Sequence, residues 1–210
     1  MTGAGLLVAH SPFSLALGGT QSRKKLGVAL LGLGNYSANL LAPALQHTEH
    51  CELRGIITGT ESKISKWQRK YGIQDSNVYT YDTIDEVANN KDIDVIYVVT
   101  PTGTHKDFAV KAANTGKHVW CEKPMAMNSD ECQAIIDACN KNGVTLSIGY
   151  RMQHEPNTRT FHHYLESMPY GKFKKVSSFA GYAGQGRDAS NWRMQQHMGG
   201  GALYDMGVYA

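Results

Sequence analysis

From Lys25 onward, short apolar runs alternate with stretches in which apolar residues recur at helical spacing. This alternation is typical of βαβ units and of a parallel sheet that is covered on both faces. We predict six strands, at residues 26–31, 52–58, 78–79, 94–100, 118–121 and 145–149. Helices are predicted between them, at residues 38–46, 62–71, 82–88, 106–114 and 128–140. The pattern therefore predicts an α/β fold with a doubly wound parallel sheet over residues 25–150.

Beyond Tyr150 the pattern changes. Residues 157–166 have the spacing of a helix, and residues 174–183 alternate as a single longer strand would. A sheet needs about three strands to be stable by itself. We therefore expect residues 151–210 to be the beginning of a second, α+β domain that is truncated at Ala210.

The composition excludes several classes of partner. The formal net charge is only +3, and the lysines and arginines are spread along the chain, so nothing predicts a nucleic-acid partner. The four cysteines, Cys51, Cys121, Cys132 and Cys139, lack the spacing of metal ligands and are expected to be buried thiols. No metal site is predicted.

Residues 1–24 resemble the latter part of a secretory leader. The stretch from Gly3 to Gly19 carries no Lys, Arg, Asp or Glu, and Ser14-Leu15-Ala16 has the small residues of a cleavage site. It is too short and too interrupted by Pro12 for a membrane span, which needs about 20 apolar residues. We expect export to the periplasm. Because a basic region is missing, a disordered or docking arm of a cytoplasmic protein stays open as the alternative.

A glycine turn follows the first predicted strand and precedes a helix. Gly32-Leu33-Gly34-Asn35-Tyr36 stands where glycines let the backbone approach a pyrophosphate at a helix N-terminus. The third small position is Ser37 rather than glycine. A purely structural turn is the alternative, but its place at the first strand of a doubly wound domain favours a Rossmann dinucleotide site.

The end of the second strand favours NADP over NAD. An acidic residue about 20 positions after the glycines would bind the ribose of NAD, whereas this strand ends in Ile57-Thr58-Gly59-Thr60. Thr58 can donate a hydrogen bond to a 2′-phosphate, and Lys63 can neutralise it. Glu61 could take the place of the acid, so NAD stays the less favoured alternative.

Two further strand ends carry candidate residues. Thr100-Pro101 and His105 follow the fourth strand, at the edge where ligands bind such sheets, although His105 could equally be an ordinary capping-region residue. Glu122-Lys123-Pro124 follows the fifth strand. Proline keeps Lys123 extended, and the Lys123-Pro124 bond could be cis at modest cost. A lysine held in this way indicates a functional residue rather than a surface charge.

Five motifs in this order resemble the Gfo/Idh/MocA oxidoreductase family. They are the glycine turn, Thr-Pro-x-x-x-His, Glu-Lys-Pro, Gly149-Tyr150-Arg151, and Gly199-Gly200-Gly201-x-x-x-Asp205-x-Gly207-x-Tyr209. The Cys-Glu-Lys-Pro and Asn191-Trp192-Arg193 segments are most similar to its glucose-fructose oxidoreductase-like members. The resemblance covers residues 25–210 and also fits an exported protein.

The resemblance implies an enzyme that transfers hydride between NADP and a sugar or polyol. Lys123 would contact the nicotinamide ribose and the substrate, Tyr209 would be the acid/base, and Asp205 would orient the substrate. Asp205 and Tyr209 are four residues apart, so on one helix they would share a face. The resemblance places further cofactor contacts at Glu122, Pro124, Arg151, Trp192 and Arg193.

Several alternatives stay open. By themselves, Asp205 could be a surface acid and Tyr209 a packed core aromatic residue. The whole protein could be a non-catalytic NADP-binding sensor. The family also implies a homo-oligomer that assembles through the sheet of the second domain, with no membrane partner.

Overall fold

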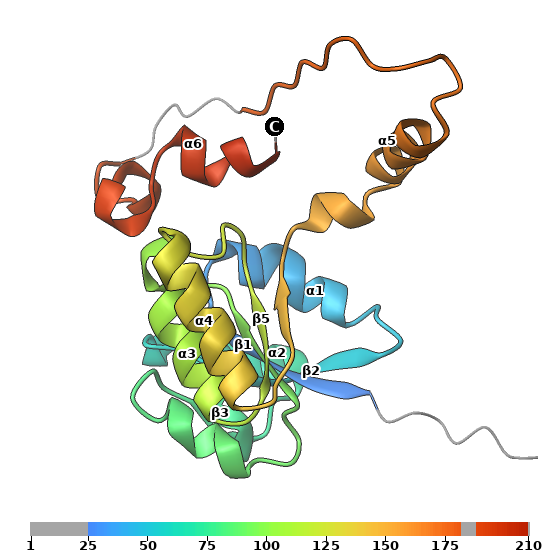
Figure 1. The fold of residues 1–210 in the computed structure, drawn as a ribbon. Helices are drawn as coiled ribbons and strands as arrows, with labels where there is room; N and C mark the ends of the chain where they lie inside the picture. Colours follow the sequence, from blue (N-terminus) through green and yellow to red (C-terminus); the bar gives the residue numbers. More distant parts are fainter. Residues whose placement is uncertain (1–24, 182–187, 210) are drawn as a thin grey trace, which may run out of the picture.

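The computed structural model describes residues 25–181 and 188–209 and contains a six-stranded parallel sheet (Figure 1). The strand order is β3-β2-β1-β4-β5-β6, so the chain moves outward from β1 and then returns to place β4 on the other side of β1. This reversal is the switch point of a doubly wound sheet. The strands are β1 (Leu26–Leu31), β2 (Cys51–Ile57), β3 (Val78–Tyr79), β4 (Val95–Val98), β5 (His118–Cys121) and β6 (Leu146–Ile148). The predicted fold class is confirmed.

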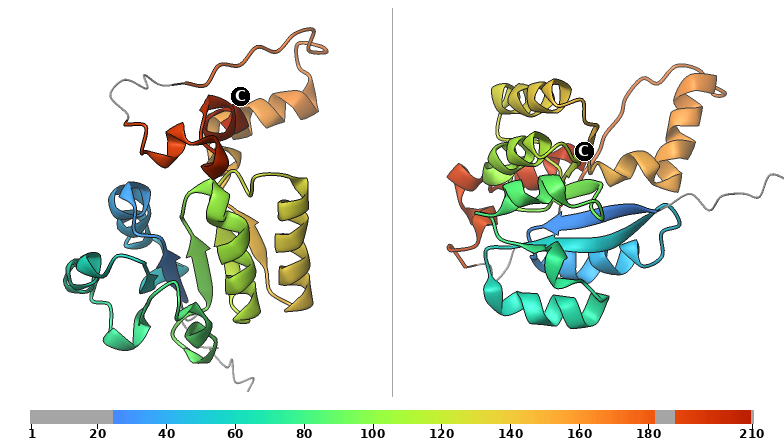
Figure 2. Two further views of the ribbon diagram at one scale, coloured as in Figure 1. Left: turned by 90° about the vertical axis from the view of Figure 1, so that its left-hand side faces the viewer. Right: turned by 90° about the horizontal axis from the view of Figure 1, so that it is seen from below.

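Helices cover both faces of the sheet, and Figure 2 shows the three layers. One face carries α1 (Ala42–Leu45) and α2 (Ile64–Tyr71), and the other carries α3 (His105–Asn114) and α4 (Ser129–Lys141). The sheet consequently has two hydrophobic clusters, one against each pair of helices.

Strand β1 shows why the apolar runs are continuous. Val28 and Leu30 belong to the cluster on the α1 and α2 side, whereas Ala29 and Leu31 belong to the other cluster. All four are fully buried. A central parallel strand has no face toward water, and its sequence is therefore apolar at every position.

Most predicted helix ends are confirmed. Gly72 ends α2 in the left-handed conformation, and the Asn128 side chain accepts a hydrogen bond from the Glu131 amide at the start of α4. The Glu131 carboxylate bonds the Met127 amide, so the predicted capping box closes one residue earlier than expected. The remaining helical turns are π or 3-10 turns: η1 (Ser37–Leu41), η2 (Glu61–Lys63), η3 (Asp75–Asn77), η4 (Ile84–Asn89), η5 (Thr102–Thr104), η6 (Arg151–His154), η7 (Trp192–Met194), η8 (Gln196–Met198) and η9 (Gly207–Tyr209).

The segment after β6 contains helix α5 (Pro156–Ser167), as predicted, and α6 (Ala202–Asp205). The strand predicted at residues 174–183 is wrong for its described part, because residues 174–181 form no regular structure. Alternation alone does not make a strand. In the described part of the chain, the sheet pairs only β1 to β6 with one another, and no strand lies beside residues 174–181. Positions 182 and 183 lie outside the described residues.

The leader-like residues 1–24 also lie outside the described residues, so export stays a prediction. Within the described ranges, no helix is long and apolar enough to cross a membrane. Figures 1 and 2 show α6 and the turns around it above the end of the sheet where β1, β4 and β5 finish.

Candidate active site

The turn after β1 brings bare backbone to the carboxyl edge of the sheet. Gly32 has a φ of +99°, and a Cβ there would stand 2.6 Å from the carbonyl oxygen of Val99. A side chain at this position is therefore excluded by both conformation and space. At Gly34 a Cβ would meet nothing within 4 Å, so this part of the turn faces open space. The predicted contacts Leu33, Asn35 and Tyr36 lie in the same turn and helix start.

Ser37 fixes this turn. Its side chain is fully buried, and its Oγ donates to the carbonyl oxygen of Gly32 at 2.5 Å. The helical segment starts immediately after Gly34, and the first N–H groups of a helix have no partner within it. Such groups attract an anion. The turn therefore fits the pyrophosphate of a dinucleotide.

A pocket of about 240 Å³ lies between this turn and α2. Lys63 lines it, and its Nζ donates to the carbonyl oxygen of Leu33 at 2.9 Å. Lys66 and Lys70 also line the pocket, so its wall is strongly basic. Thr58 is buried instead, and its Oγ1 accepts from the Thr60 amide at 3.1 Å, which leaves its hydroxyl proton free to donate. The predicted contact of Thr58 with a phosphate stays a prediction.

His105 joins two strand-end loops. Its ring is 1% exposed, with Nδ1 2.9 Å from the carbonyl oxygen of Pro124 and Nε2 2.8 Å from that of Thr100. Burial lowers the pKa of His105, although the carbonyl contacts favour its charged form. Because both ring nitrogens lie against carbonyl oxygens, the geometry favours a supporting role over contact with a cofactor. Cofactor contacts by Thr100, Pro101 and His105 stay predictions.

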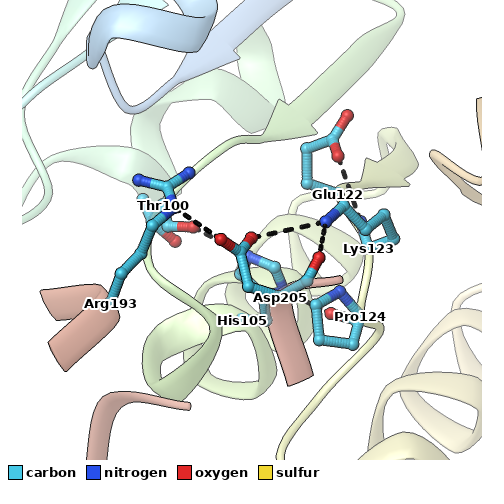
Figure 3. A network of polar contacts seen from close by, with 7 residues as sticks. All are labelled: Thr100, His105, Glu122, Lys123, Pro124, Arg193 and Asp205. Carbon is cyan, nitrogen blue, oxygen red and sulfur yellow. Dashed lines mark hydrogen bonds and ion pairs between the residues drawn. The ribbon is translucent and has the colours of Figure 1, made fainter. Parts of the chain in front are cut away.

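Lys123 follows β5, and the Lys123-Pro124 peptide bond is cis. The Lys123 ammonium donates to the main-chain oxygen of Asp205 at 2.5 Å and lies 3.5 Å from Oδ1 of the Asp205 carboxylate (Figure 3). The same ammonium lies 4.5 Å from the centroid of the Tyr209 ring. The Lys123 and Asp205 side chains are only 11% and 12% exposed. The structure thus brings together the three residues predicted to be catalytic.

Asp205 and Tyr209 do not share one helix, and that prediction is wrong. Helix α6 ends at Asp205, and Tyr209 lies in the separate 3-10 turn η9. Met206 leaves the helical path with a φ of −117°, just before Gly207. Both residues nevertheless contact Lys123. The Tyr209 ring also has a second cation near it, because the Arg151 guanidinium lies 5.5 Å from the ring centroid.

Glu122 is a buried carboxyl beside Lys123. It is 8% exposed and accepts a hydrogen bond from the Tyr97 hydroxyl at 2.6 Å and from the Lys123 amide at 3.2 Å. Burial raises the pKa of Glu122, while these bonds and the charges of Lys123 and Arg151 oppose the shift. Burial and the negative charge of Glu122 also raise the pKa of Tyr97, so its hydroxyl stays protonated as the donor.

Arg193 and Trp192 lie in the turn η7, and Arg193 contacts the site through Asp205. The Arg193 guanidinium lies 4.4 Å from the Trp192 ring centroid, and its Nε donates to Oδ2 of Asp205 at 3.0 Å. Arg193 therefore contacts a predicted catalytic residue. Its predicted contact with a cofactor, like those of Trp192 and Arg151, stays a prediction. Burial raises the pKa of Tyr36, and the nearby Glu122 and Tyr209 raise it further.

Comparison with known proteins identifies the family. A family model described as an oxidoreductase family with an NAD-binding Rossmann fold matches residues 26–150. The chain belongs to the Gfo/Idh/MocA family. The resemblance predicted from the sequence motifs is confirmed.

Three relatives illustrate this membership. D-xylose 1-dehydrogenase (NADP(+)) 2 of Haloferax volcanii is 29% identical over 86% of this chain and 54% of the relative. The scyllo-inositol 2-dehydrogenase (NADP(+)) of Bacillus subtilis is 28% identical over 73% of this chain and 48% of the relative. The crystal structure of aldose-aldose oxidoreductase from Caulobacter crescentus, complexed with glycerol, superposes with a TM-score of 0.80 at 34% identity and covers 89% of this chain and 55% of that one. The chain spans about half the length of these Gfo/Idh/MocA relatives.

Two glycines allow residues 188–209 to dock on this Gfo/Idh/MocA Rossmann domain, a packing role that the sequence reasoning did not assign to them. A Cβ on Gly103 would lie 2.9 Å from the carbonyl oxygen of His197, and one on Gly199 would lie 2.7 Å from Cβ of Thr102. The Tyr204 hydroxyl adds a hydrogen bond to the carbonyl oxygen of Met127 at 2.7 Å. This close packing places Asp205 over Lys123.

The sequence reasoning missed Tyr97, and it named Gly149 only as part of a motif, without a packing role. A Cβ on Gly149 would lie 2.7 Å from Oε1 of Glu122, so the glycine makes room for the buried carboxyl group. A tyrosine within the apolar run Val95–Val98 was the available signal, since a buried hydroxyl needs a partner. No group of acidic, histidine or cysteine residues in the described ranges could hold a metal ion.

We predict that Tyr97→Phe lowers the free energy of unfolding by about 1–3 kcal/mol at pH 7, because it removes a donor from a buried carboxylate. Burial raises the pKa of Glu122, so protonation of Glu122 favours the folded state, and ionisation disfavours it as the pH rises through that pKa. The cost of Tyr97→Phe should therefore shrink as the pH falls and Glu122 becomes protonated. Urea unfolding of both proteins over a pH series measures this.

Glu122→Gln is the control for that experiment, since it removes the titration and keeps an acceptor for Tyr97. In the Glu122→Gln background, the cost of Tyr97→Phe should no longer depend on pH. A pH-dependent cost that persists there would assign the effect to another group.

We predict that Gly103→Ala loosens residues 188–209 while leaving the Rossmann domain folded. Gly103 has no positive φ, so the added methyl group affects mainly the packing against His197 and Met198. Trypsin cleavage after Arg193 should accelerate at least several-fold. Gly116→Ala is the matched control: Gly116 has a φ of +75° and open space around it, so the substitution costs about 1–2 kcal/mol of stability without touching the docked segment. Equal cleavage rates in the two variants would contradict the role of Gly103.

Proposed function

We propose that the protein is an NADP-dependent oxidoreductase that transfers hydride between nicotinamide and a sugar or polyol. The observation that carries the proposal is the convergence of Lys123, Asp205 and Tyr209 at the carboxyl edge of the sheet. The glycine turn at the same edge fits a pyrophosphate. Membership in the Gfo/Idh/MocA family and relatives named as xylose, inositol and aldose oxidoreductases support this class of substrate.

The choice of NADP rests on the basic pocket beside the glycine turn. Lys63, Lys66 and Lys70 line that pocket, and β2 ends at Ile57 without a carboxylate at its tip. A 2′-phosphate would find a cation there, whereas the ribose hydroxyls of NAD would lack their usual acidic partner. Two of the relatives described above carry NADP(+) in their names, which agrees with this choice.

When bound, the nicotinamide supplies the hydride acceptor or donor. The residues of this chain supply position and proton transfer. Tyr209 Oη would take the proton of the substrate hydroxyl when the alcohol is oxidised and return it when the carbonyl is reduced. The Lys123 ammonium, 4.5 Å from the Tyr209 ring centroid, would hold the substrate oxygen, and the Asp205 carboxylate would accept a hydrogen bond from a neighbouring sugar hydroxyl.

The near-complete burial of Lys123 and Asp205 supports catalysis over a sensor role. Two charged side chains that are 11% and 12% exposed are costly to keep, and simple nucleotide binding does not require them. The test is to express the intact protein, supply NADP, and follow nicotinamide absorbance with aldoses, ketoses and polyols. Sugar-dependent absorbance change supports the proposal. Tight NADP binding with no such change would favour the non-catalytic sensor.

We predict that Lys123→Ala and Tyr209→Phe each lower kcat by about 100- to 10,000-fold, because Tyr209 transfers the proton and Lys123 holds the substrate oxygen during that transfer. The Kd for NADP should change far less, since the glycine turn and Lys63 are untouched. Tyr164→Phe is a matched control, because Tyr164 is an exposed tyrosine on α5. Near wild-type turnover in either variant would refute the role given to that residue.

We predict that Lys63→Ala weakens NADP binding by about 10- to 100-fold, which corresponds to a lost charge-assisted hydrogen bond of about 1.5–3 kcal/mol. Binding of NAD should hardly change, because NAD lacks the 2′-phosphate. Arg69→Ala is the control: Arg69 is exposed on α2, the helix that follows Lys63, and does not line the pocket. Titrations with NADP and with NAD, followed by the intrinsic fluorescence of the protein, measure the two Kd values and their ratio. An equal loss of affinity for NAD and NADP would show that Lys63 contacts a part of the dinucleotide that both cofactors share.

A further inference from the structure

The two carboxylate oxygens of Asp205 contact different cations. Oδ2 accepts a hydrogen bond from Nε of Arg193 at 3.0 Å, while Oδ1 lies 3.5 Å from the Lys123 ammonium. Figure 3 shows the Asp205 carboxylate between the two basic side chains. The Lys123 ammonium makes its short contact with the main-chain oxygen of Asp205, at 2.5 Å. Arg193 is therefore the closer of the two cations to the carboxylate.

The backbone holds Arg193 in this place. The Asn191 side chain accepts a hydrogen bond from the Arg193 amide at 3.1 Å and starts the turn η7. The carbonyl oxygen of Arg193 then accepts one from the Gly201 amide at 2.9 Å, directly before α6. A Cβ on Gly200 would lie 2.6 Å from that carbonyl oxygen, so this approach requires a glycine. The segment with Arg193 is thus tied to the helix that presents Asp205.

The side chain of Arg193 is restricted as well. Its guanidinium lies over the Trp192 ring, 4.4 Å from the ring centroid, and such a planar group loses less conformational freedom on forming a hydrogen bond than an ammonium group does. Arg193 is 35% exposed and Asp205 only 12%, so the ion pair runs from the rim of the site into its interior. Because Arg193 holds Oδ2 at hydrogen-bonding distance, the Asp205 carboxylate cannot rotate freely. Its other oxygen keeps a fixed direction toward Lys123.

We propose that Arg193 is a positioning residue that orients the Asp205 carboxylate. Arg193 holds Oδ2, and Oδ1, which lies beside the Lys123 ammonium, would also accept a hydrogen bond from a sugar hydroxyl. This assignment rests on the proposed function and replaces direct cofactor contact as the main role of Arg193. It also gives the Asn191-Trp192-Arg193 segment a part in the chemistry rather than in dinucleotide binding.

The kinetic test uses Arg193→Ala, Arg193→Gln and Arg193→Lys in the intact protein. Arg193→Ala should lower kcat by about 10- to 100-fold, which is the effect of a small misplacement at a reacting centre. The Kd for NADP should change less than about threefold. Millimolar guanidinium should restore part of the lost kcat in Arg193→Ala, and Arg193→Lys should retain more activity than Arg193→Gln. Arg159→Ala, at an exposed arginine on α5, is the control.

The outcomes separate the alternatives. A raised Kd for NADP with unchanged kcat at saturation would overturn the proposal in favour of cofactor contact. An unchanged kcat and an unchanged Kd would also overturn it. If the wild-type protein turns over no sugar, the proposed function fails, and a crystal structure of Arg193→Gln then decides the inference alone. The Asp205 carboxylate should rotate away from its present direction in that variant, and retention of the wild-type rotamer would refute a positioning role.

Discussion

The contact between the Lys123 ammonium and Asp205 is the interaction on which the candidate site depends. It joins the end of β5 to a residue 82 positions later, and both side chains are largely removed from water. Burying a charge is unfavourable unless opposite charge and hydrogen bonds replace the lost water. Here a main-chain oxygen serves the ammonium, and two cations serve the carboxylate. Each member of the site is therefore stable in its place only while the others are present.

The need to replace lost water also applies to Glu122, the buried residue directly before Lys123. In a parallel sheet covered on both faces, the interior of each strand offers few partners for a polar side chain, and polar groups gather where the strands end. Glu122 is buried at such an end and needs donors there. Tyr97 supplies one from within β4, and the Lys123 amide supplies another. The backbone of Lys123 is thus held by the Glu122 carboxyl group, which accepts a hydrogen bond from its amide.

The sheet could be predicted from sequence because its strands are buried on both sides and appear as continuous apolar runs, as in β1. Lys123 could be predicted because proline follows it. Asp205 and Tyr209 could be placed only through motif resemblance, since their spacing alone equally allows a surface acid and a core aromatic residue. Their supposed common helix was wrong, because Met206 leaves the helix before Gly207. The strand expected near Val176 failed for a related reason: a strand exists only beside a partner, and pairing is not a local property.

The packing contacts that bring the distant motifs together could not be predicted from the sequence, for a physical reason. Gly103 and Gly199 lack side chains because another part of the chain lies against each of them, and such an approach leaves no periodic signal. The glycine turn after β1 is packed against the residues that follow β4, whereas Asp205 reaches Lys123 only when residues 188–209 dock over Gly103. The two parts of the site therefore rest on different packing contacts. It follows that a change at the docking contacts can separate Asp205 from Lys123 while leaving the glycine turn after β1 intact.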